Sequence, residues 1–373
     1  MILIELSEIC EYYNDKIDVS KLSIDNYIST ENMLSNKAGV VEATSLPTTT
    51  TTQKFEHGDV LVSNIRPYFK KIWYADKCGG CSNDVLVFRA KEGIDSMFLY
   101  YVLSSDDFFA YSMGTSKGTK MPRGDKQAIM RYQVPKIDLL EQRKIVEILK
   151  CIDEKIKNNE KVNKNLYEQA KLLFKARFLD IDYSNLPTGW HIGTVEEIIE
   201  LHDSKRIPLS GPDRQKMEKK YPYYGATSLM DYVDNYIFDG IYLLLGEDGT
   251  VVDENGFPIL QYIYGQFWVN NHAHILTGKS GYSVEELFLF FSLTNIQNIV
   301  TGAVQQKISQ QNLKKVPAIV PSFDALKEFD DIIQPMFAQI RNLRDENESL
   351  SALRDSLLPR LMSGELDVSS VNI

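Results

Sequence analysis

Basic side chains gather in four short stretches of the sequence, and each stretch also carries aromatic or amide side chains. Lys and Arg neutralise DNA phosphates, while Arg, Gln and Asn have the paired hydrogen-bonding groups that recognise base edges. The candidate DNA-contact residues in the first half of the chain are Arg66, Lys70, Lys71, Lys117, Lys120, Arg123 and Lys126. Those in the second half are Lys205, Arg206, Arg214, Lys216, Tyr223, Tyr224, Gln305, Gln306 and Lys307. Because a single charge run is usually only a solvated surface, this prediction needs a second observation.

The composition fits a globular protein that binds DNA only locally. The chain has 373 residues, with 41 Lys and Arg against 51 Asp and Glu, and a net charge of −10. That balance argues against a nonspecific DNA coat protein but not against local basic patches. At ~150 residues each, roughly two to three domains are expected. The chain has no run of ~18 apolar residues, no basic N-terminal signal region and only four cysteines, so a cytoplasmic protein is expected.

Signatures of catalysis and of metal binding are mostly absent. There is no phosphate-binding Gly-x-x-x-x-Gly-Lys-Ser/Thr loop, no Gly-x-Gly-x-x-Gly and no Pro-Pro dipeptide. The pair Cys78–Cys81 has no second ligand pair nearby, so a turn with two incidental thiols is predicted. His272 and His274 lack a third ligand, so a hydrogen-bonded structural role is predicted for them. Pro212-Asp213 with Glu218–Lys220 does not have the spacing of a nuclease site. We expect no catalytic residue, metal or cofactor.

Internal repetition supplies the second observation. Residues 97–105 match residues 287–295 at an offset of 190, and residues 58–62 match residues 240–244 at an offset of 182. Val134-Pro135 matches Val316-Pro317, also at an offset of 182. The basic clusters at 112–136 and 301–317 occupy equivalent places in the two copies, which favours a shared function over incidental surface charge.

A long helix is predicted at the end of each copy, because apolar residues alternate steps of four and three. The first stripe contains Ile145, Leu149, Ile152, Ile156, Asn159, Asn163, Leu166, Ala170 and Leu173. The second contains Leu326, Phe329, Ile333, Met336, Ile340, Leu343, Asn347, Leu350 and Leu357, with Arg354 in one slot. Such narrow stripes predict that the two helices pair with each other, their Asn residues fixing the register. A kink or break is expected near Gln334, because Pro335 lies in the pattern.

The expected fold class is therefore α+β, with two globular parts in pseudo-repeat separated by two long helices that form an antiparallel coiled coil. Short strands are predicted at Val60–Val62, Val85–Phe88, Tyr242–Leu245 and His274–Leu276, and short buried helices near Met97 and Leu287. The predicted ranges are 1–137 for the first globular part, 138–180 for the central helix, 181–320 for the linker and second globular part, and 321–365 for the C-terminal helix. A stiff rod of about 60 Å could set the distance between two binding sites.

The whole chain resembles the specificity subunit of type I restriction–modification systems. The motifs that carry the resemblance occur in order in both halves. In the first half they are Ile28–Met33, Gly58–Pro67 and Leu140–Ile145. In the second they are Leu186–Trp190, Tyr223–Ala226, Gly246–Gly249, Asn270–His274 and Leu357–Leu366. The first half lacks the Pro-x-Gly-Trp entry of Pro187–Trp190, so the start of the first domain is less well defined.

The resemblance implies two target recognition domains, each binding one half of a bipartite target in double-stranded DNA. It also implies two modification subunits docked on the helices, with restriction subunits joining them, no catalytic residue in this chain and no membrane. Methylation and cleavage would belong to those partners. Two alternatives stay open at this point, a coiled-coil scaffold that binds only proteins and a DNA-modifying enzyme with an undetected site.

Overall fold

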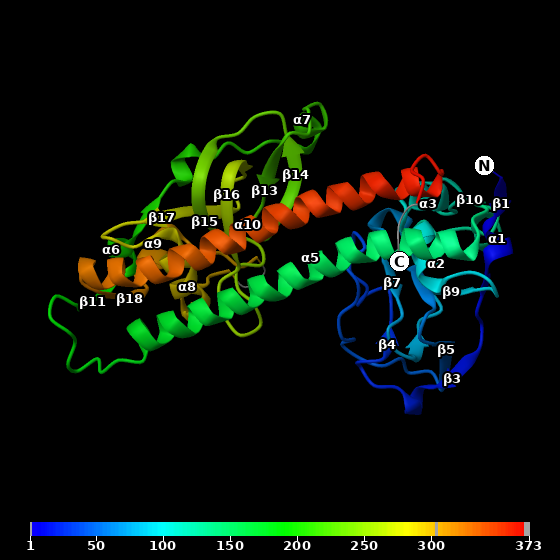
Figure 1. Ribbon diagram of the computed structural model, residues 1–373. Helices are drawn as coiled ribbons and strands as arrows, with labels where there is room; N and C mark the ends of the chain where they lie inside the picture. Colours follow the sequence, from blue (N-terminus) through cyan, green and yellow to red (C-terminus); the bar gives the residue numbers. More distant parts are fainter. Residues whose placement is uncertain (1, 303–304, 369–373) are drawn as a thin grey trace. The chain divides into compact units, whose positions relative to one another are not determined.

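The computed structural model describes residues 2–302 and 305–368, which form two compact units. Unit 1 contains Met1–Asn158 with Glu346–Ile373, and unit 2 contains Asn159–Asp345. Each unit thus combines one globular repeat with part of each long helix (Figure 1). The predicted ranges treat the helices as separate segments, so the compact units divide the chain differently. No helix in the described part of the chain is both long and apolar enough to cross a membrane.

Unit 1 contains two four-stranded sheets. One is antiparallel with the order β2–β9–β6–β7, the other has the order β3–β5–β8–β4, and β1 pairs with β10. The strands are β1 (Leu3–Glu5), β2 (Cys10–Tyr12), β3 (Lys16–Asp18), β4 (Tyr27–Ile28), β5 (Thr51–Phe55), β6 (Val60–Ser63), β7 (Ile72–Tyr74), β8 (Gly79–Cys81), β9 (Val85–Ala90) and β10 (Gln133–Pro135). The helices are α1 (Leu6–Ile9), α2 (Ser96–Ser104), α3 (Asp106–Gly114), α4 (Lys126–Ile129) and the start of α5 (Leu139–Phe174).

Unit 2 contains one six-stranded sheet with the order β12–β17–β15–β16–β13–β14, and β11 pairs with β18. The strands are β11 (His191–Thr194), β12 (Ile199–Leu201), β13 (Tyr221–Tyr224), β14 (Leu229–Val233), β15 (Phe238–Gly246), β16 (Leu260–Val269), β17 (Ala273–Gly278) and β18 (Pro317–Val320). The helices are α6 (Val195–Ile198), α7 (Gly211–Gln215), α8 (Val284–Leu293), α9 (Gln310–Lys314) and most of α10 (Phe323–Met362).

The strand pairing confirms the duplication but corrects its alignment. β6 corresponds to β15 and β9 to β17, since Val60 pairs with Phe88 as Leu243 pairs with Leu276. The offset from Val60 to Leu243 is 183, so the predicted offset of 182 is wrong by one residue. A one-residue slip would exchange the two faces of the strand. An apolar run in one repeat can be aligned with a run in the other repeat at several offsets, whereas the hydrogen bonds between the strands are consistent with only one offset.

The other two predicted matches are each wrong by two residues. Asp95 and Ser283 are the N-caps of α2 and α8, which gives an offset of 188 rather than 190. The carbonyls of Tyr132 and Val316 accept the first backbone N–H of α1 and α6, which gives 184 rather than 182. The predicted segments do form the expected strands and short helices. Element type follows from composition, but register depends on caps and hydrogen bonds.

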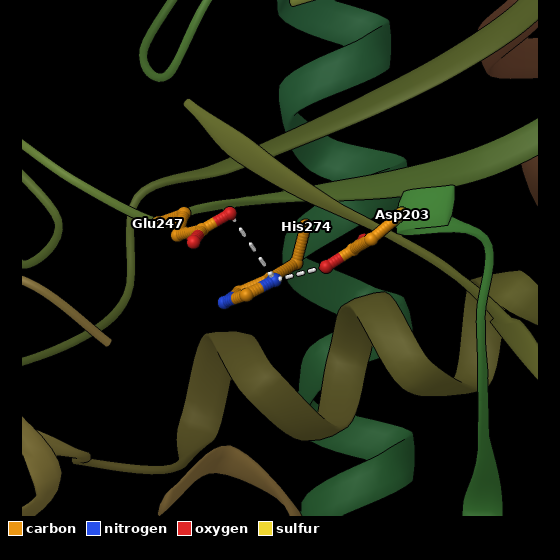
Figure 2. Close-up of side chains that lie close together, drawn as sticks. All are labelled: Asp203, Glu247 and His274. Atoms are coloured by element: carbon orange, nitrogen blue, oxygen red, sulfur yellow. Dashed lines mark hydrogen bonds and ion pairs between the residues drawn. The ribbon is translucent and has the colours of Figure 1, made fainter. Parts of the chain in front are cut away.

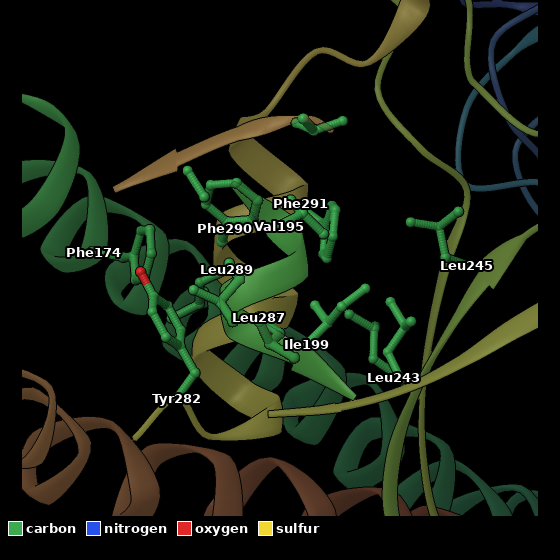
Figure 3. Packing of buried hydrophobic residues seen from close by; sticks show 14 of the residues in the cluster. Phe174, Val195, Ile199, Leu243, Leu245, Tyr282, Leu287, Leu289, Phe290 and Phe291 are labelled. Atoms are coloured by element: carbon green, nitrogen blue, oxygen red, sulfur yellow. The ribbon is translucent and has the colours of Figure 1, made fainter. Parts of the chain in front are cut away.

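The main core of unit 2 packs α8 against one face of the sheet (Figure 3). Leu243 and Leu245 of β15 lie in this cluster with Leu287 and Phe291 of α8, whereas Leu244 lies in the cluster on the other face. This alternation is the expected consequence of a strand that is buried on both faces. It fixes the position and orientation of the loops that leave β15 and β17.

Two adjacent carboxyl groups of α8, those of Glu285 and Glu286, are buried beside this apolar core. Glu286 of α8 is 0% exposed, and its Oε1 has no hydrogen-bond partner among the described residues. Burial, with a smaller effect of Asp330 and Glu285, raises the pKa of Glu286 to about 8. The backbone N–H of Ser283 donates to the other carboxyl oxygen, Oε2, at 2.8 Å. Glu286 is therefore a neutral, protonated carboxylic acid in the folded chain at pH 7, and it is hydrogen-bonded to the N-cap residue Ser283.

The long helices pair in antiparallel orientation, as predicted. In unit 1, Arg354 of α10 pairs with Asp153 of α5 at 2.8 Å. In unit 2, the ring of Phe329 of α10 lies 5.7 Å from the ring of Phe174 of α5. Leu173 was predicted to face α10 but is 43% exposed. Phe174 faces α10 instead of Leu173, because the last buried residues of this segment, Ala170, Phe174 and Phe178, are spaced four residues apart. The helix continues beyond Phe174 as a π-helical turn over Lys175–Leu179.

Of the kink or break predicted near Gln334, the break is wrong, because α10 is one continuous helix of 40 residues. Proline removes only one helical hydrogen bond, which would have ended at the carbonyl of Asp331. Asp331 and Pro335 are exposed, so water can reach that carbonyl. Ile333 and Phe337 are buried on the opposite face and hold the helix on both sides of the proline.

The predicted turn at Cys78–Cys81 is wrong, because three of its four residues lie in a strand. Gly79–Cys81 form β8, which pairs with β4 and β5. A Cβ on Gly79 would lie 2.1 Å from the carbonyl oxygen of Asn26, so this close strand pairing requires glycine. Both cysteines are free, and burial raises the pKa of Cys81 to about 12, which keeps it a neutral thiol.

Candidate nucleic-acid interface

Two of the predicted basic clusters meet in unit 1. The segment 64–71, which follows β6, lies against the segment 117–124, which follows α3. The backbone N–H of Arg66 donates to the carbonyl of Pro122 at 2.8 Å, and that of Gly124 donates to the carbonyl of Asn64 at 3.2 Å. We call these two segments loop pair 1.

Unit 2 contains the same arrangement, between segment 246–249 after β15 and segment 301–308. The backbone N–H of Gly249 donates to the carbonyl of Gln306 at 3.0 Å, and that of Ile308 to the carbonyl of Glu247 at 2.9 Å. We call these segments loop pair 2; residues 303–304 lie outside the described residues. The two loop pairs are equivalent parts of the two repeats.

Arg123 and Lys307 occupy the same position in the two loop pairs. Arg123 exchanges backbone hydrogen bonds with Lys117 at 2.9 and 3.0 Å, and Lys307 does so with Thr301 at 2.8 and 2.9 Å. Their side chains are 52% and 51% exposed, so both reach the surface. Each has one acidic neighbour: Arg123 lies 3.1 Å from Asp84, and Lys307 lies 3.3 Å from Glu247.

Close packing holds loop pair 1 in place. A Cβ on Gly124 would lie 2.8 Å from Asn64 Oδ1, 2.8 Å from Ile129 Cδ1 and 3.0 Å from Ser112 Oγ, so a larger residue there would force these side chains or the backbone to shift. Asn64 Oδ1 and Arg66 Nε are buried without a hydrogen-bond partner in the described part of the chain. Most buried polar atoms in proteins have a hydrogen-bond partner. These two atoms of loop pair 1 are exceptions, because no other described residue bonds to them.

Lys37, which the sequence analysis did not single out, shares an acidic partner with Lys70 of loop pair 1, although its side chain is only 14% exposed. Lys37 and Lys70 both lie 2.9 Å from the same carboxylate oxygen of Asp106. Burial raises the pKa of Asp106, but the hydrogen bonds and charges of the two lysines outweigh it and lower the pKa overall. Lys71 donates instead to the carbonyl of Thr30 at 2.6 Å. Lys37 has no basic neighbour in sequence, so only the fold could reveal it.

The remaining predicted residues of unit 1 are at the surface. Lys117 is 81% exposed and pairs with Asp125 at 2.5 Å. The hydrogen bond from Lys117, followed by that from Ala128, lowers the pKa of Asp125, which caps α4. Lys120 and Lys126 are exposed. All seven predicted residues of unit 1 therefore lie on or beside loop pair 1.

The prediction that Arg206 faces DNA is wrong, because its guanidinium lies in a buried polar cluster of unit 2. Its side chain is only 13% exposed. Arg206 donates to Glu247 at 2.6 Å and lies 3.4 Å from Asp203. His274, with a fully buried side chain, contacts Asp203 at 2.6 Å (Figure 2). We call Asp203, Arg206, Glu247 and His274 the buried cluster.

The buried cluster has ligand atoms close enough for a metal, but its chemistry is already complete. Single ligand atoms of Asp203, Glu247 and His274 lie within 4.8 Å of one another. Burial would raise the pKa of both carboxyls, but His274 and Arg206, respectively, give the largest opposing effects and lower them overall. Arg206 supplies the positive charge that a metal would bring, and both ring nitrogens of His274 have partners. These residues do not fit a metal site, and His274 has the hydrogen-bonded role that was predicted.

A second correction concerns Tyr223 and Arg214. Tyr223 is 1% exposed, so its ring cannot contact DNA in this fold. Arg214 lies over that ring at 4.9 Å, pairs with Asp231 at 3.2 Å and donates to the carbonyl of Leu209 at 2.6 Å. Arg214 therefore fastens α7 to β14, although the sequence shows only a basic and aromatic run. The burial follows from the segment that covers this side of β13, since Arg214 lies over the ring and the backbone N–H of Leu209 donates to the Tyr223 hydroxyl at 3.1 Å.

The other predicted residues of unit 2 are exposed or half-buried. Lys205, Lys216 and Gln305 are exposed, and Gln306 is half-buried with its carbonyl used inside loop pair 2. Tyr224 is half-buried, with its ring 6.0 Å from that of Phe267. Of the nine residues predicted in unit 2, loop pair 2 contains Gln305, Gln306 and Lys307.

Comparison with known proteins agrees with this repeated architecture. The type I restriction modification DNA specificity domain matches residues 3–168 and again residues 187–352. These two matches cover most of the chain and coincide with the two repeats. The chain belongs to the family of type I restriction–modification DNA specificity proteins.

Relatives with known names point the same way. A type I restriction enzyme specificity subunit of Methanocaldococcus jannaschii is 23% identical over 311 residues, which are 75% of this chain and 71% of the relative. The EcoprrI specificity subunit of Escherichia coli is 24% identical over 132 residues, 35% of this chain and 32% of the relative. The fold resembles the crystal structure of the S subunit from M. genitalium, with a TM-score of 0.54, 16% identity, and 97% and 96% of the two chains covered. Some named relatives are thus matched over only about a third of their length.

Proposed function

We propose that loop pair 1 contacts one half of a bipartite DNA target and that loop pair 2 contacts the other half. The observation that carries this proposal is the equivalent placement of Arg123 and Lys307. Each is a half-exposed cation on the same hairpin of its repeat, fastened by the same backbone bonds to the loop after β6 or β15. A repeated basic position is the expected feature of a protein that binds two DNA segments in the same way.

The ion pairs at these positions can be exchanged for DNA contacts. A surface ion pair such as Arg123–Asp84 contributes only about 0–1 kcal/mol to stability. A guanine edge offers Arg a bidentate contact that is worth about 1–3 kcal/mol of discrimination. Arg123 is therefore our candidate for base recognition, and Lys117, Lys120, Lys70 and Lys307 are candidates for phosphate contact. Lys71, Arg66, Lys126, Lys205, Lys216, Tyr224, Gln305 and Gln306 complete the proposed surface.

We further propose that the chain has no catalytic activity of its own and works in a cytoplasmic complex. Two modification subunits would dock on α5 and α10, restriction subunits would join them, and the helices would set the spacing of the half-sites. Exposed apolar residues on the helices support docking: Leu172 is 67% exposed, Phe323 65% and Ile332 54%. With a net charge of −10, the isolated chain should bind DNA weakly.

Exchange of residues 187–320 for those of another family member tests the proposal. In a host that also carries the modification subunits, methylated adenines would be mapped before and after the exchange. We expect one half-site to change and the other to remain, because loop pair 1 is untouched. A change in both half-sites would refute independent recognition, and a chain that never directs methylation to a bipartite sequence would refute the function itself.

A further inference from the structure

The buried cluster lies directly beneath loop pair 2. His274 is on β17, and its Nε2 lies 2.8 Å from the carbonyl oxygen of Ile308, the residue after Lys307. Its Nδ1 lies 2.6 Å from Asp203 Oδ2. Asp203 also accepts a hydrogen bond from Gln310 at 2.6 Å, just beyond the same loop. Two polar contacts thus connect segment 301–310 to the interior of unit 2.

Both ring nitrogens of His274 face acceptors, a carboxylate and a carbonyl. The carbonyl oxygen of Ile308 can only accept a hydrogen bond, so Nε2 of His274 is the donor in that contact. The charged groups that surround the ring are Asp203, Glu247 at 3.8 Å, and Arg206, which bridges the two carboxylates. The ring therefore has a fixed orientation, and the carbonyl of Ile308 has a fixed donor.

Unit 1 has no such contact at the equivalent position. Leu86 of β9 pairs with Val62 as His274 pairs with Leu245, so leucine stands where unit 2 has histidine. Loop pair 1 is held instead by the close packing around Gly124, whose equivalent in loop pair 2 is Ile308. Ile308 is instead fully buried in the main core of unit 2, and its carbonyl is the group that His274 contacts.

We propose that His274 and Asp203 are positioning residues for DNA recognition by unit 2, which act by holding Gln306–Ile308 so that Lys307 meets its half-site. The inference rests on the proposed function of loop pair 2. Without the His274 contact, the Ile308 carbonyl loses its donor and the hairpin shifts relative to β15. The half-site recognised by unit 1 does not depend on either residue.

The test uses the full chain in a host with its modification subunits, and the measurement is the sequence preference of adenine methylation. For His274→Leu, the residue found in unit 1, we expect discrimination at the unit 2 half-site to fall about tenfold, as for loss of one buried hydrogen bond. The unit 1 half-site should be unchanged. His274→Gln retains one donor and should give an intermediate loss. Leu276→Val, on the same strand and fully buried but facing the core, is the control for stability.

The outcomes separate the two hypotheses. A wild-type chain that directs no bipartite methylation refutes the proposed function. A bipartite wild-type pattern that both His274 variants leave unchanged overturns the positioning role alone. If both His274 variants fail to fold while Leu276→Val folds, the histidine supports the core rather than the loop, and the positioning role is also overturned. An altered unit 2 half-site in His274→Leu, partly restored in His274→Gln, supports it.

Discussion

Substitution of Gly124 by alanine should damage loop pair 1 more than any other single methyl group. The added Cβ would lie 2.8 Å from Asn64 Oδ1 and from Ile129 Cδ1, and 3.0 Å from Ser112 Oγ. Ordinary contacts of a Cβ begin near 3.4 Å, so the hairpin or the three buried side chains that it meets must move by about half an ångström or more. Such overpacking typically costs about 1–3 kcal/mol. Because Arg123 is the preceding residue, its guanidinium would move with the backbone.

Urea unfolding of the purified chain and methylation mapping in the host measure the two effects separately. We expect Gly124→Ala to lower the free energy of unfolding by about 1–3 kcal/mol and to weaken discrimination only at the unit 1 half-site. Gly114→Ala is the matched control, because Gly114 ends α3 and has nothing within 4 Å of the added Cβ. Wild-type stability together with an unchanged half-site in Gly124→Ala would refute the packing argument.

Three further predictions concern charge, pH and length. Arg123→Ala should lose about 1–3 kcal/mol on cognate DNA and less on mismatched DNA in binding titrations of the assembled complex. Lys117→Ala should weaken both equally and reduce the salt slope by about 1; identical behaviour of the two variants would contradict these roles. Because the pKa of Glu286 is raised, the folded chain keeps a proton that the unfolded chain releases between a pH of about 4.5 and about 8. The free energy of unfolding should therefore fall as pH rises through this range, by up to about 1.4 kcal/mol per pH unit. Glu286→Gln should flatten this fall in urea titrations, and an unchanged slope would show that burial does not control the acid. Four residues added to α5 after Asn158, with four added to α10 after Asp345, lengthen each helix by about 6 Å. In methylation maps, this change should widen the spacer between the two half-sites by about one base pair. An unchanged spacer with full activity would mean that the helices do not set the distance between the half-sites.

Patterns that depend only on periodicity were predictable from the sequence. The stripes of apolar residues gave the two long helices and their pairing, because a narrow stripe needs a narrow partner. The apolar β-rich runs gave β6, β9, β15 and β17. The repeated position of the basic clusters indicated a shared surface, and Arg123 and Lys307 do occupy equivalent positions in that surface.

Side-chain environment was not predictable in the same way. Arg206 and Lys205 are neighbours in a basic run, yet Lys205 is exposed, whereas Arg206 is enclosed by the carboxylates of Asp203, three residues away, and of Glu247, which follows β15. Tyr223 and Tyr224 are neighbours in one strand, yet Tyr223 is buried and Tyr224 is half-buried. Which residue of such a pair faces inward depends on long-range strand pairing, and local sequence does not contain that information.

The two repeats hold equivalent hairpins by different means, and this determines which segment can be exchanged. Loop pair 1 depends on a glycine within the hairpin itself, whereas loop pair 2 depends on Asp203 and His274, which lie far from Lys307 in sequence. A graft of residues 301–308 alone would leave these partners behind, and the carbonyl of Ile308 would meet whatever residue stands at the His274 position of the recipient. Transfer of a half-site should therefore require the whole of residues 187–320, because the geometry of the hairpin is set from within the sheet.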